Sequence, residues 1–165
     1  MSYDFNAAEV YRIAIQIEEN GRTFYEEGQK LVQDTGVREL FGELALQEIE
    51  HKKKFEALVS LLPPETAAST VWDPENELDQ YIRMMADEHV FVTSASVKEE
   101  IARLTDARSA LKLAMELEKD SVIFFLGLED ATRGKKDQEL IHALVKEEQE
   151  HLRRLTAELV KLARK

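Results

Sequence analysis

The sequence ELFGELALQEIEH, residues 39–51, recurs in altered form 100 residues later as ELIHALVKEEQEH, residues 139–151. Both copies end in the motif Glu-x-x-His, which is formed by Glu48 with His51 and by Glu148 with His151. Residues three apart in an α-helix lie close together on one face, one turn apart, so both side chains of a motif can reach one cation. These stretches predict two related helices that carry polar groups on their inward faces.

The helix before each copy is repeated as well. AIQIEENGRTFY, from Ala14, aligns without a gap with AMELEKDSVIFF, from Ala114, and this alignment matches Glu18 with Glu118. All four glutamates lie on or beside an apolar helix face, judged from the residues three, four and seven positions away. A buried carboxylate without a partner costs several kcal/mol or takes up a proton. Four of them in one core therefore require a compensating charge, which metal cations would supply.

The repeat provides a ligand set of four carboxylates and two imidazoles, enough for two metal ions. The predicted ligands are Glu18, Glu48, His51, Glu118, Glu148 and His151. Carboxylate oxygen with imidazole nitrogen suits iron or manganese, and zinc is a further candidate. The chain has no cysteine, which excludes thiolate zinc sites and iron–sulfur centres. The alternative interpretation is a set of paired polar residues that bind no metal.

Two other histidines are not predicted to bind metal. Glu139 and His142 form a third Glu-x-x-His, but His142 falls off the apolar stripe and its counterpart in the repeat is Gly42. We interpret His142 as a surface residue. His89 is a single histidine between the two halves, and we interpret it as structural.

Apolar spacing, with only six glycines and three prolines, predicts an all-α fold in one domain spanning residues 1–165. The expected long helices cover residues 6–32, 37–62, 106–132 and 136–162. Asn6 with Glu9 would cap the first helix, and Pro63-Pro64 would stop the second. Leu31 and Leu62 are expected on the inward faces of these two helices.

The connection over residues 63–105 is too long for a bare loop and is expected to contain short helices. Asp73-Pro74-Glu75 predicts the start of one helix, and Ser96-Val97-Lys98-Glu99 predicts a capping box for another. Four apolar residues are expected to pack this segment onto the bundle: Trp72, Tyr81, Met85 and Phe91. The result is two antiparallel helical hairpins joined by a crossover that runs the length of the bundle, roughly 40 Å.

Charge and hydropathy restrict the partners of the chain. A formal net charge of −11 disfavours binding to nucleic acid or to an acidic membrane surface. Neither a signal peptide nor a membrane-spanning segment is recognisable in the sequence. We therefore expect a cytoplasmic protein with no membrane association.

The motifs together resemble the rubrerythrins, within the ferritin-like di-iron carboxylate proteins. IEENGRTFY with LEKDSVIFF, and QEIEHKKKF with EEQEHLRRL, look like the two halves of a rubrerythrin-type domain. The resemblance implies a ferritin-like four-helix bundle and two iron ions bridged by Glu48 and Glu148. Glu18 with His51 and Glu118 with His151 would complete one ion each. Tyr25 matches a tyrosine that hydrogen-bonds a ligand carboxylate, which makes it the candidate catalytic residue, whereas Phe125 at the repeat-related position cannot act in this way.

The sequence departs from this family in three ways. Rubrerythrins have an extra glutamate three residues after the third-helix ligand, where this chain has Ser121, so metal movement of the kind linked to that glutamate is not implied. The four cysteines of a rubredoxin domain are absent, so electrons would come from outside the chain. Ile49 stands at the haem-methionine position of bacterioferritin and no fifth helix follows, so neither haem nor a 24-subunit cage is expected.

The resemblance implies an oxidoreductase, a peroxidase or oxidase that reduces hydrogen peroxide or O₂ at a carboxylate-bridged two-metal site. Its implied partners are an external electron donor, such as a rubredoxin-like protein, and a second copy of the chain in a homodimer. Two alternatives stay open: an iron-handling ferroxidase, and a helical module without catalytic activity.

Overall fold

The structure is a computed structural model that describes residues 7–62, 77, 80–81, 84–85, 89, 94–132 and 134–165. The described part of the chain contains five α-helices: α1 (Ala7–Leu31), α2 (Thr35–Leu61), α4 (Ser94–Ala102), α5 (Ala107–Ala131) and α6 (Lys135–Leu162). The four long helices begin and end within two residues of their predicted bounds. None of the helices searched there is long and apolar enough to cross a membrane.

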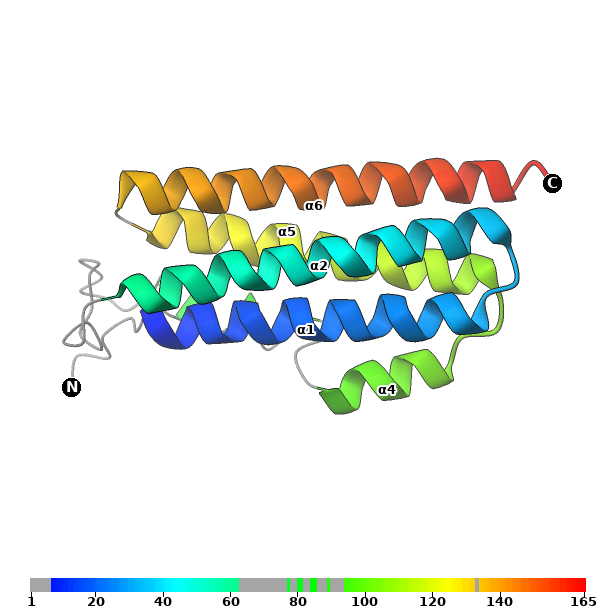
Figure 1. Cartoon of the computed structure of the whole chain (residues 1–165), viewed down its shortest axis with the longest axis horizontal. Coiled ribbons are helices and arrows are strands. Elements are labelled where there is room, and N and C mark those ends of the chain that lie inside the picture. The colour runs from blue at the N-terminus through cyan, green and yellow to red at the C-terminus, as the bar shows by residue number, and fades with distance from the viewer. Residues whose placement is uncertain are drawn as a thin grey trace.

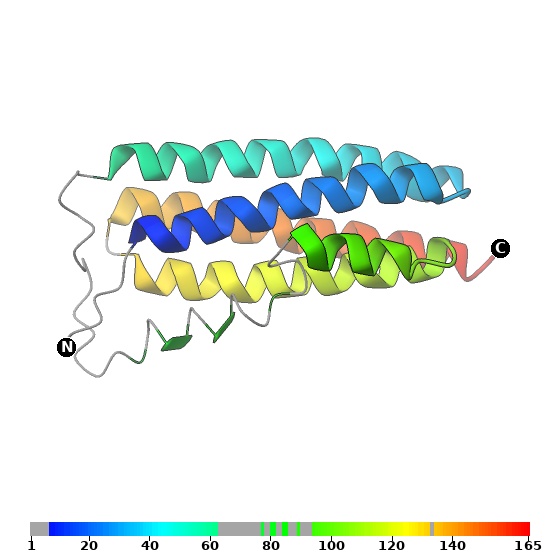
Figure 2. The same cartoon turned by 90° about the horizontal axis from the view of Figure 1, so that it is seen from below.

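The helices form a bundle of two hairpins. α1 packs antiparallel to α2, and α5 packs antiparallel to α6, with the two hairpins side by side (Figures 1 and 2). α2 ends at the opposite end of the bundle from the start of α5, so the connection between them travels the length of the bundle. α4 lies in this connection and packs along the outside of α1. The predicted all-α bundle with one crossover is therefore confirmed.

The core consists of two apolar clusters separated by a polar layer. The first cluster is built from the start of α1, the end of α2, the end of α5 and the start of α6, and includes Ala14, Phe55, Phe125 and Ile141. The second occupies the other end of the bundle and includes Phe24, Leu44 and Leu111. On every long helix the predicted metal ligands fall between the stretches that form these clusters. The apolar core thus surrounds the polar layer at both ends.

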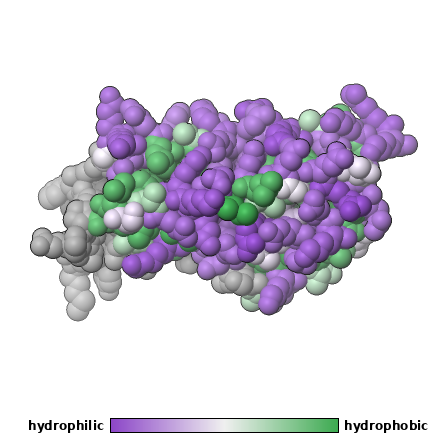
Figure 3. Space-filling model, viewed as in Figure 1, coloured by the Kyte–Doolittle hydropathy of each residue, from purple (hydrophilic) through white to green (hydrophobic). Residues whose placement is uncertain are grey.

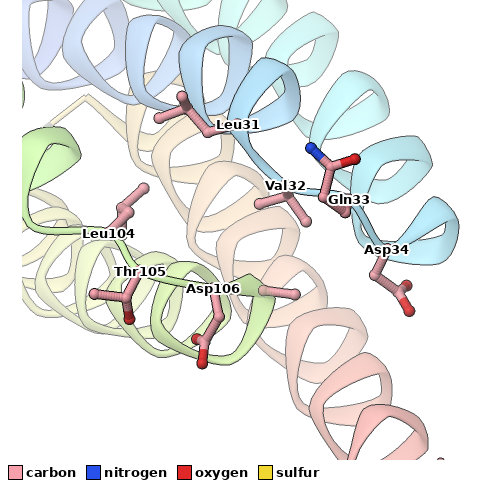
Figure 4. Close-up of a pocket in the computed structure, with 8 residues that line it drawn as sticks. Leu31, Val32, Gln33, Asp34, Leu104, Thr105 and Asp106 are labelled. Atoms are coloured by element: carbon pink, nitrogen blue, oxygen red, sulfur yellow. The ribbon is translucent and has the colours of Figure 1, made fainter.

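Side-chain caps fix the turns at one end of the bundle. Asp34 accepts a hydrogen bond from the backbone N–H of Val37 at 3.2 Å, at the start of α2. Asp106 and Ser109 form a reciprocal capping box at the start of α5. Both aspartates also line a pocket between these turns, with Leu31, Val32 and other residues shown in Figure 4. Capping accounts for both acidic groups of this pocket.

Some local predictions were wrong. Leu31 is 54% exposed because it ends α1, and the neighbouring Val32 takes the buried position. α4 begins at Ser94, so Ser96 lies inside the helix and does not cap it, since no helix breaker separates the two serines. Tyr81 is 38% exposed, and its packing onto the bundle stays a prediction, whereas Met85 and Leu62 do pack against the first cluster. The predicted roles of Asn6, Trp72, Asp73-Pro74-Glu75 and Phe91 lie outside the described residues.

The hydropathy of the surface can be followed on one face of the bundle. The face in Figure 3 is largely hydrophilic, with its hydrophobic groups in separate small patches. Leu46 and Leu61 on α2 are 66% and 71% exposed. The homodimer remains a prediction.

Phe55 tests the packing of the first cluster. Its ring is fully buried and lies 4.9 Å from that of Phe125 and 6.5 Å from that of Tyr11, measured between centroids. We expect Phe55→Ala to lower the free energy of unfolding of the metal-free protein by about 3–5 kcal/mol, measured by urea denaturation. Leu46→Ala, at an exposed position, should change it by less than about 0.5 kcal/mol. Equal stability of the two variants would contradict this description of the core.

Candidate metal centre

The polar layer contains all six residues that the sequence predicts as ligands. α1 contributes Glu18, α5 contributes Glu118, and the Glu-x-x-His motifs lie on α2 and α6. Each of the six is at most 4% exposed. They meet at one level because each lies near the middle of its helix, as Glu18 does in α1 (Ala7–Leu31) and Glu118 in α5 (Ala107–Ala131), although these two helices run in opposite directions.

The six residues fall into two overlapping groups whose donor atoms lie within 4.8 Å of one another. One group is Glu18, Glu48, His51 and Glu148, and the other is Glu48, Glu118, Glu148 and His151. Glu48 and Glu148 belong to both groups. The Oε1 atom of Glu148 lies 2.6 Å from Nδ1 of His51, and its Oε2 atom lies 3.1 Å from Nδ1 of His151. Glu148 therefore turns one oxygen toward each half of the site, as a bridging carboxylate would.

Both imidazoles present the same atom to the centre. The rings of His51 and His151 stack with centroids 5.3 Å apart and an angle of 12° between their planes. Nδ1 of His151 lies 3.5 Å from Glu118 and 3.6 Å from Glu48, and Nδ1 of His51 lies 3.4 Å from Glu18. Each Nδ1 thus faces carboxylates from neighbouring helices.

The donor atoms of the centre fit a metal. Seven buried side-chain atoms among the described residues make no hydrogen bond of good geometry, although ion-pair contacts link several of them, and all belong to this layer: Glu18 Oε1 and Oε2, Glu48 Oε1, His51 Nδ1, Glu148 Oε1 and Oε2, and His151 Nδ1. Buried polar atoms are normally paired, because an unpaired one costs about 1–3 kcal/mol. Oxygen and imidazole donors at these positions would be satisfied by coordination to cations.

Charges in the layer are strongly coupled. Burial, reinforced by the neighbouring Glu18 and Glu148, raises the pKa of Glu48 well above its usual range. Burial and the charge of Glu148 raise the pKa of Glu118 to about 8. Burial alone would lower the pKa of His151, but attraction by Glu118 and Glu148 outweighs it and raises this pKa to about 10. Without metal, protons therefore have to neutralise part of the buried charge.

Attraction between Glu148 and His51 also shifts the pKa values of both groups. Burial opposes ionisation of Glu148, but the two histidines on either side of it hold its pKa well below the usual range. Burial opposes protonation of His51, yet Glu148 and Glu147 raise its pKa well above the usual value. The central carboxylate is thus the most favoured site of negative charge in the layer.

Tyr25 supports the layer from one side. Its ring is fully buried and its hydroxyl donates a hydrogen bond to Oε1 of Glu118. Burial, followed by the charge of Glu118, raises the pKa of Tyr25 well above its usual value, so the hydroxyl stays a donor. Phe125 occupies the matched position in the other half and offers no hydroxyl. The support is one-sided, as expected from the sequence.

Sequence reasoning missed Glu147. Its Oε2 atom accepts a hydrogen bond from Nε2 of His51 at 2.7 Å, and Lys54 donates to both of its oxygens at 2.8 Å. The hydrogen bond from His51, helped by Lys54, lowers the pKa of Glu147 to about 2. The only signal in the sequence is that Glu147 precedes a predicted ligand while its counterpart Gln47 is uncharged.

The remaining histidines lie outside both metal groups. His142 is on the surface, where Nδ1 lies 3.0 Å from Glu129. His89 is buried, and its Nε2 lies 3.2 Å from the hydroxyl of Ser121, one turn beyond Glu118 on α5. Burial lowers the pKa of His89 to about 4, so its ring is neutral at neutral pH. The position that departs from the rubrerythrin pattern is thus filled by a small hydroxyl that pairs with a neutral imidazole.

Comparison with known proteins agrees with this arrangement. The model of the rubrerythrin family matches residues 9–159. The chain belongs to the rubrerythrin family. Among solved structures, it is similar to a Thermotoga maritima protein described as ferritin-like and diiron-carboxylate, with 23% identity, a TM-score of 0.72, and coverage of 95% of this chain and 96% of that one. No curated protein matches. Within the rubrerythrin family, this chain therefore has the ferritin-like bundle and a buried carboxylate and histidine cluster.

The stability of the metal-free rubrerythrin-family protein should fall as pH rises. Glu118 and His151 bind protons more tightly in the folded state, with pKa values of about 8 and 10 against 4.5 and 6.5. The folded state therefore holds more protons between about pH 5 and 10, and stability is lost as they dissociate. We expect the unfolding free energy, measured after removal of metal with EDTA, to decrease from pH 6 to pH 10. Glu118→Gln should flatten this decrease, and stability that rises over the same range would contradict the assignment.

Proposed function

We propose that this protein binds two iron ions in the polar layer and uses them to reduce hydrogen peroxide. The observation that carries the proposal is the position of Glu148, which directs one oxygen toward each histidine within a cluster of unpaired donor atoms. In this proposal Glu48 and Glu148 would be shared by both ions, Glu18 and His51 would hold one of them, and Glu118 and His151 would hold the other.

Iron is favoured by the donor set. Four carboxylates with two imidazoles suit iron or manganese better than copper(I), and no thiolate is available in the sequence. The description of the similar Thermotoga maritima protein as a diiron-carboxylate protein supports the same choice. Manganese and zinc remain the alternatives that a metal analysis would distinguish.

The chemistry requires two electrons. Two bound ferrous ions would supply one electron each, and the reduction of hydrogen peroxide to two water molecules takes two electrons and two protons. The side chains of the chain hold the ions, and the apolar clusters on both sides of the layer exclude bulk water. Tyr25 orients Glu118 through its hydrogen bond. An external donor, such as a rubredoxin-like protein or a small reductant, would return two electrons to the centre.

Reduction of peroxide can be measured on protein loaded with ferrous iron without oxygen. We expect two irons per chain and consumption of one hydrogen peroxide for every two irons oxidised. Glu148→Ala should remove both metal and turnover, because it deletes the carboxylate shared by both positions. Glu150→Ala removes an exposed carboxylate of the same helix, which is paired with Arg153, and should change neither.

Two results would contradict the proposal. Peroxide consumption by metal-free Glu148→Ala at the native rate would place the reaction elsewhere. Retention of many more than two irons per chain, with iron oxidation but slow use of peroxide, would favour the iron-handling alternative.

Tyr25 can be tested separately. We expect Tyr25→Phe to keep two irons per chain and to lower the rate of peroxide reduction about 10- to 100-fold, because Glu118 loses the hydrogen bond that orients it. Metal content and rate are measured on the same sample. A rate equal to that of the native protein would show that the hydrogen bond has no part in turnover.

A further inference from the structure

The two imidazoles of the centre have different partners on their outer sides. His51 directs Nδ1 toward the centre and Nε2 toward Glu147, 2.7 Å away. Lys54 binds both oxygens of this carboxylate and holds it in place. Because an ionised carboxylate can only accept, a hydrogen lies on Nε2 of His51, and Nδ1 offers its lone pair to a metal once the metal has displaced the proton on that nitrogen.

The matched positions in the other half are occupied differently. Under the 100-residue repeat, Glu147 corresponds to Gln47, and Lys54 corresponds to Arg154. Arg154 contacts the side-chain oxygen of Gln47 at 3.5 Å and forms an ion pair with Glu43. In the described part of the chain His151 forms ion pairs through Nδ1 alone. The outer side of His151 therefore lacks the carboxylate that His51 has.

This difference has a known effect on metal binding. An imidazole that donates its outer N–H to a carboxylate is more basic at its other nitrogen and binds a cation more strongly. Removing such a contact typically weakens metal binding about 10- to 100-fold.

We propose that Glu147 makes the two metal positions unequal, so that the position at Glu18 and His51 binds its ion more tightly and fills first. The position at Glu118 and His151 fills second. Glu147 acts through His51 and is a positioning residue. The inference rests on the two-metal proposal and adds an order of filling to it.

Zinc is a suitable probe because it is diamagnetic and leaves the signals of all four histidines visible in ¹⁵N NMR. The metal-free full-length protein, labelled with ¹⁵N-histidine, is titrated with Zn²⁺ and followed in parallel by calorimetry. We expect the His51 signals to change during the first equivalent and those of His151 during the second. The two affinities should differ about 10- to 100-fold. His142, which lies on the surface beside Glu129, serves as the internal reference.

Variants at the matched positions distinguish the role of Glu147 from a general loss of folded structure. Glu147→Gln should weaken the first step about 10- to 100-fold, so that both positions fill together. The double variant Glu147→Gln with Gln47→Glu should reverse the order, with His151 changing first, which loss of structure could not produce. Glu150→Gln removes the same charge from an exposed place on α6 and should keep the native order.

The outcomes distinguish this inference from the proposal on which it rests. Two zinc ions bound with equal affinity, His151 filling first, or a Glu147→Gln titration identical to the native one would overturn the inference and leave the two-metal site intact. No change at either His51 or His151 on addition of zinc would overturn both.

Discussion

Four carboxylates and two imidazoles share one buried layer. The free-energy cost of burying these charged groups is the constraint on which the rest of the bundle depends. Apolar clusters close the layer at both ends, so water cannot solvate the charges. The histidines offset part of the negative charge. Glu148 lies between them, and they hold its pKa well below the usual range. Glu48 and Glu118 are left with raised pKa values, which shows that the polypeptide alone does not balance the layer. A pair of cations would complete this balance.

Much of this arrangement could be predicted from the sequence because it depends on spacing within single helices. The period of the apolar residues located the four long helices, and the 100-residue repeat placed each matched glutamate near the middle of its helix, so that the glutamates meet at one level. The Glu-x-x-His motifs placed a carboxylate and an imidazole on one face by helix geometry alone. Local signals were less reliable: Ser96 has the pattern of a cap but lies within α4, because a capping pattern suits a helix start without requiring one.

Contacts between helices could not be predicted in this way. Glu147 and His51 are 96 residues apart, and Tyr25 and Glu118 are 93 residues apart. No pattern within one helix indicates that such residues meet. Resemblance to a family suggested the hydrogen bond of Tyr25 but not that of Glu147. His89 shows the same limit, since it pairs with Ser121, which is 32 residues away in the sequence.

The ligands repeat between the halves, but their surroundings do not. Gly21 lies three residues after Glu18 on α1. A Cβ added at Gly21 would lie 3.1 Å from Oε2 of Glu48, so the missing side chain leaves room for this carboxylate beside α1. The matched residue, Ser121, instead pairs with His89. Tyr25 has a hydroxyl where Phe125 has none. Six matched ligands by themselves would give two equal metal positions. Any difference between the ions must therefore arise from these neighbours, and the hydrogen bond between His51 and Glu147, which His151 lacks among the described residues, favours the position at Glu18 and His51.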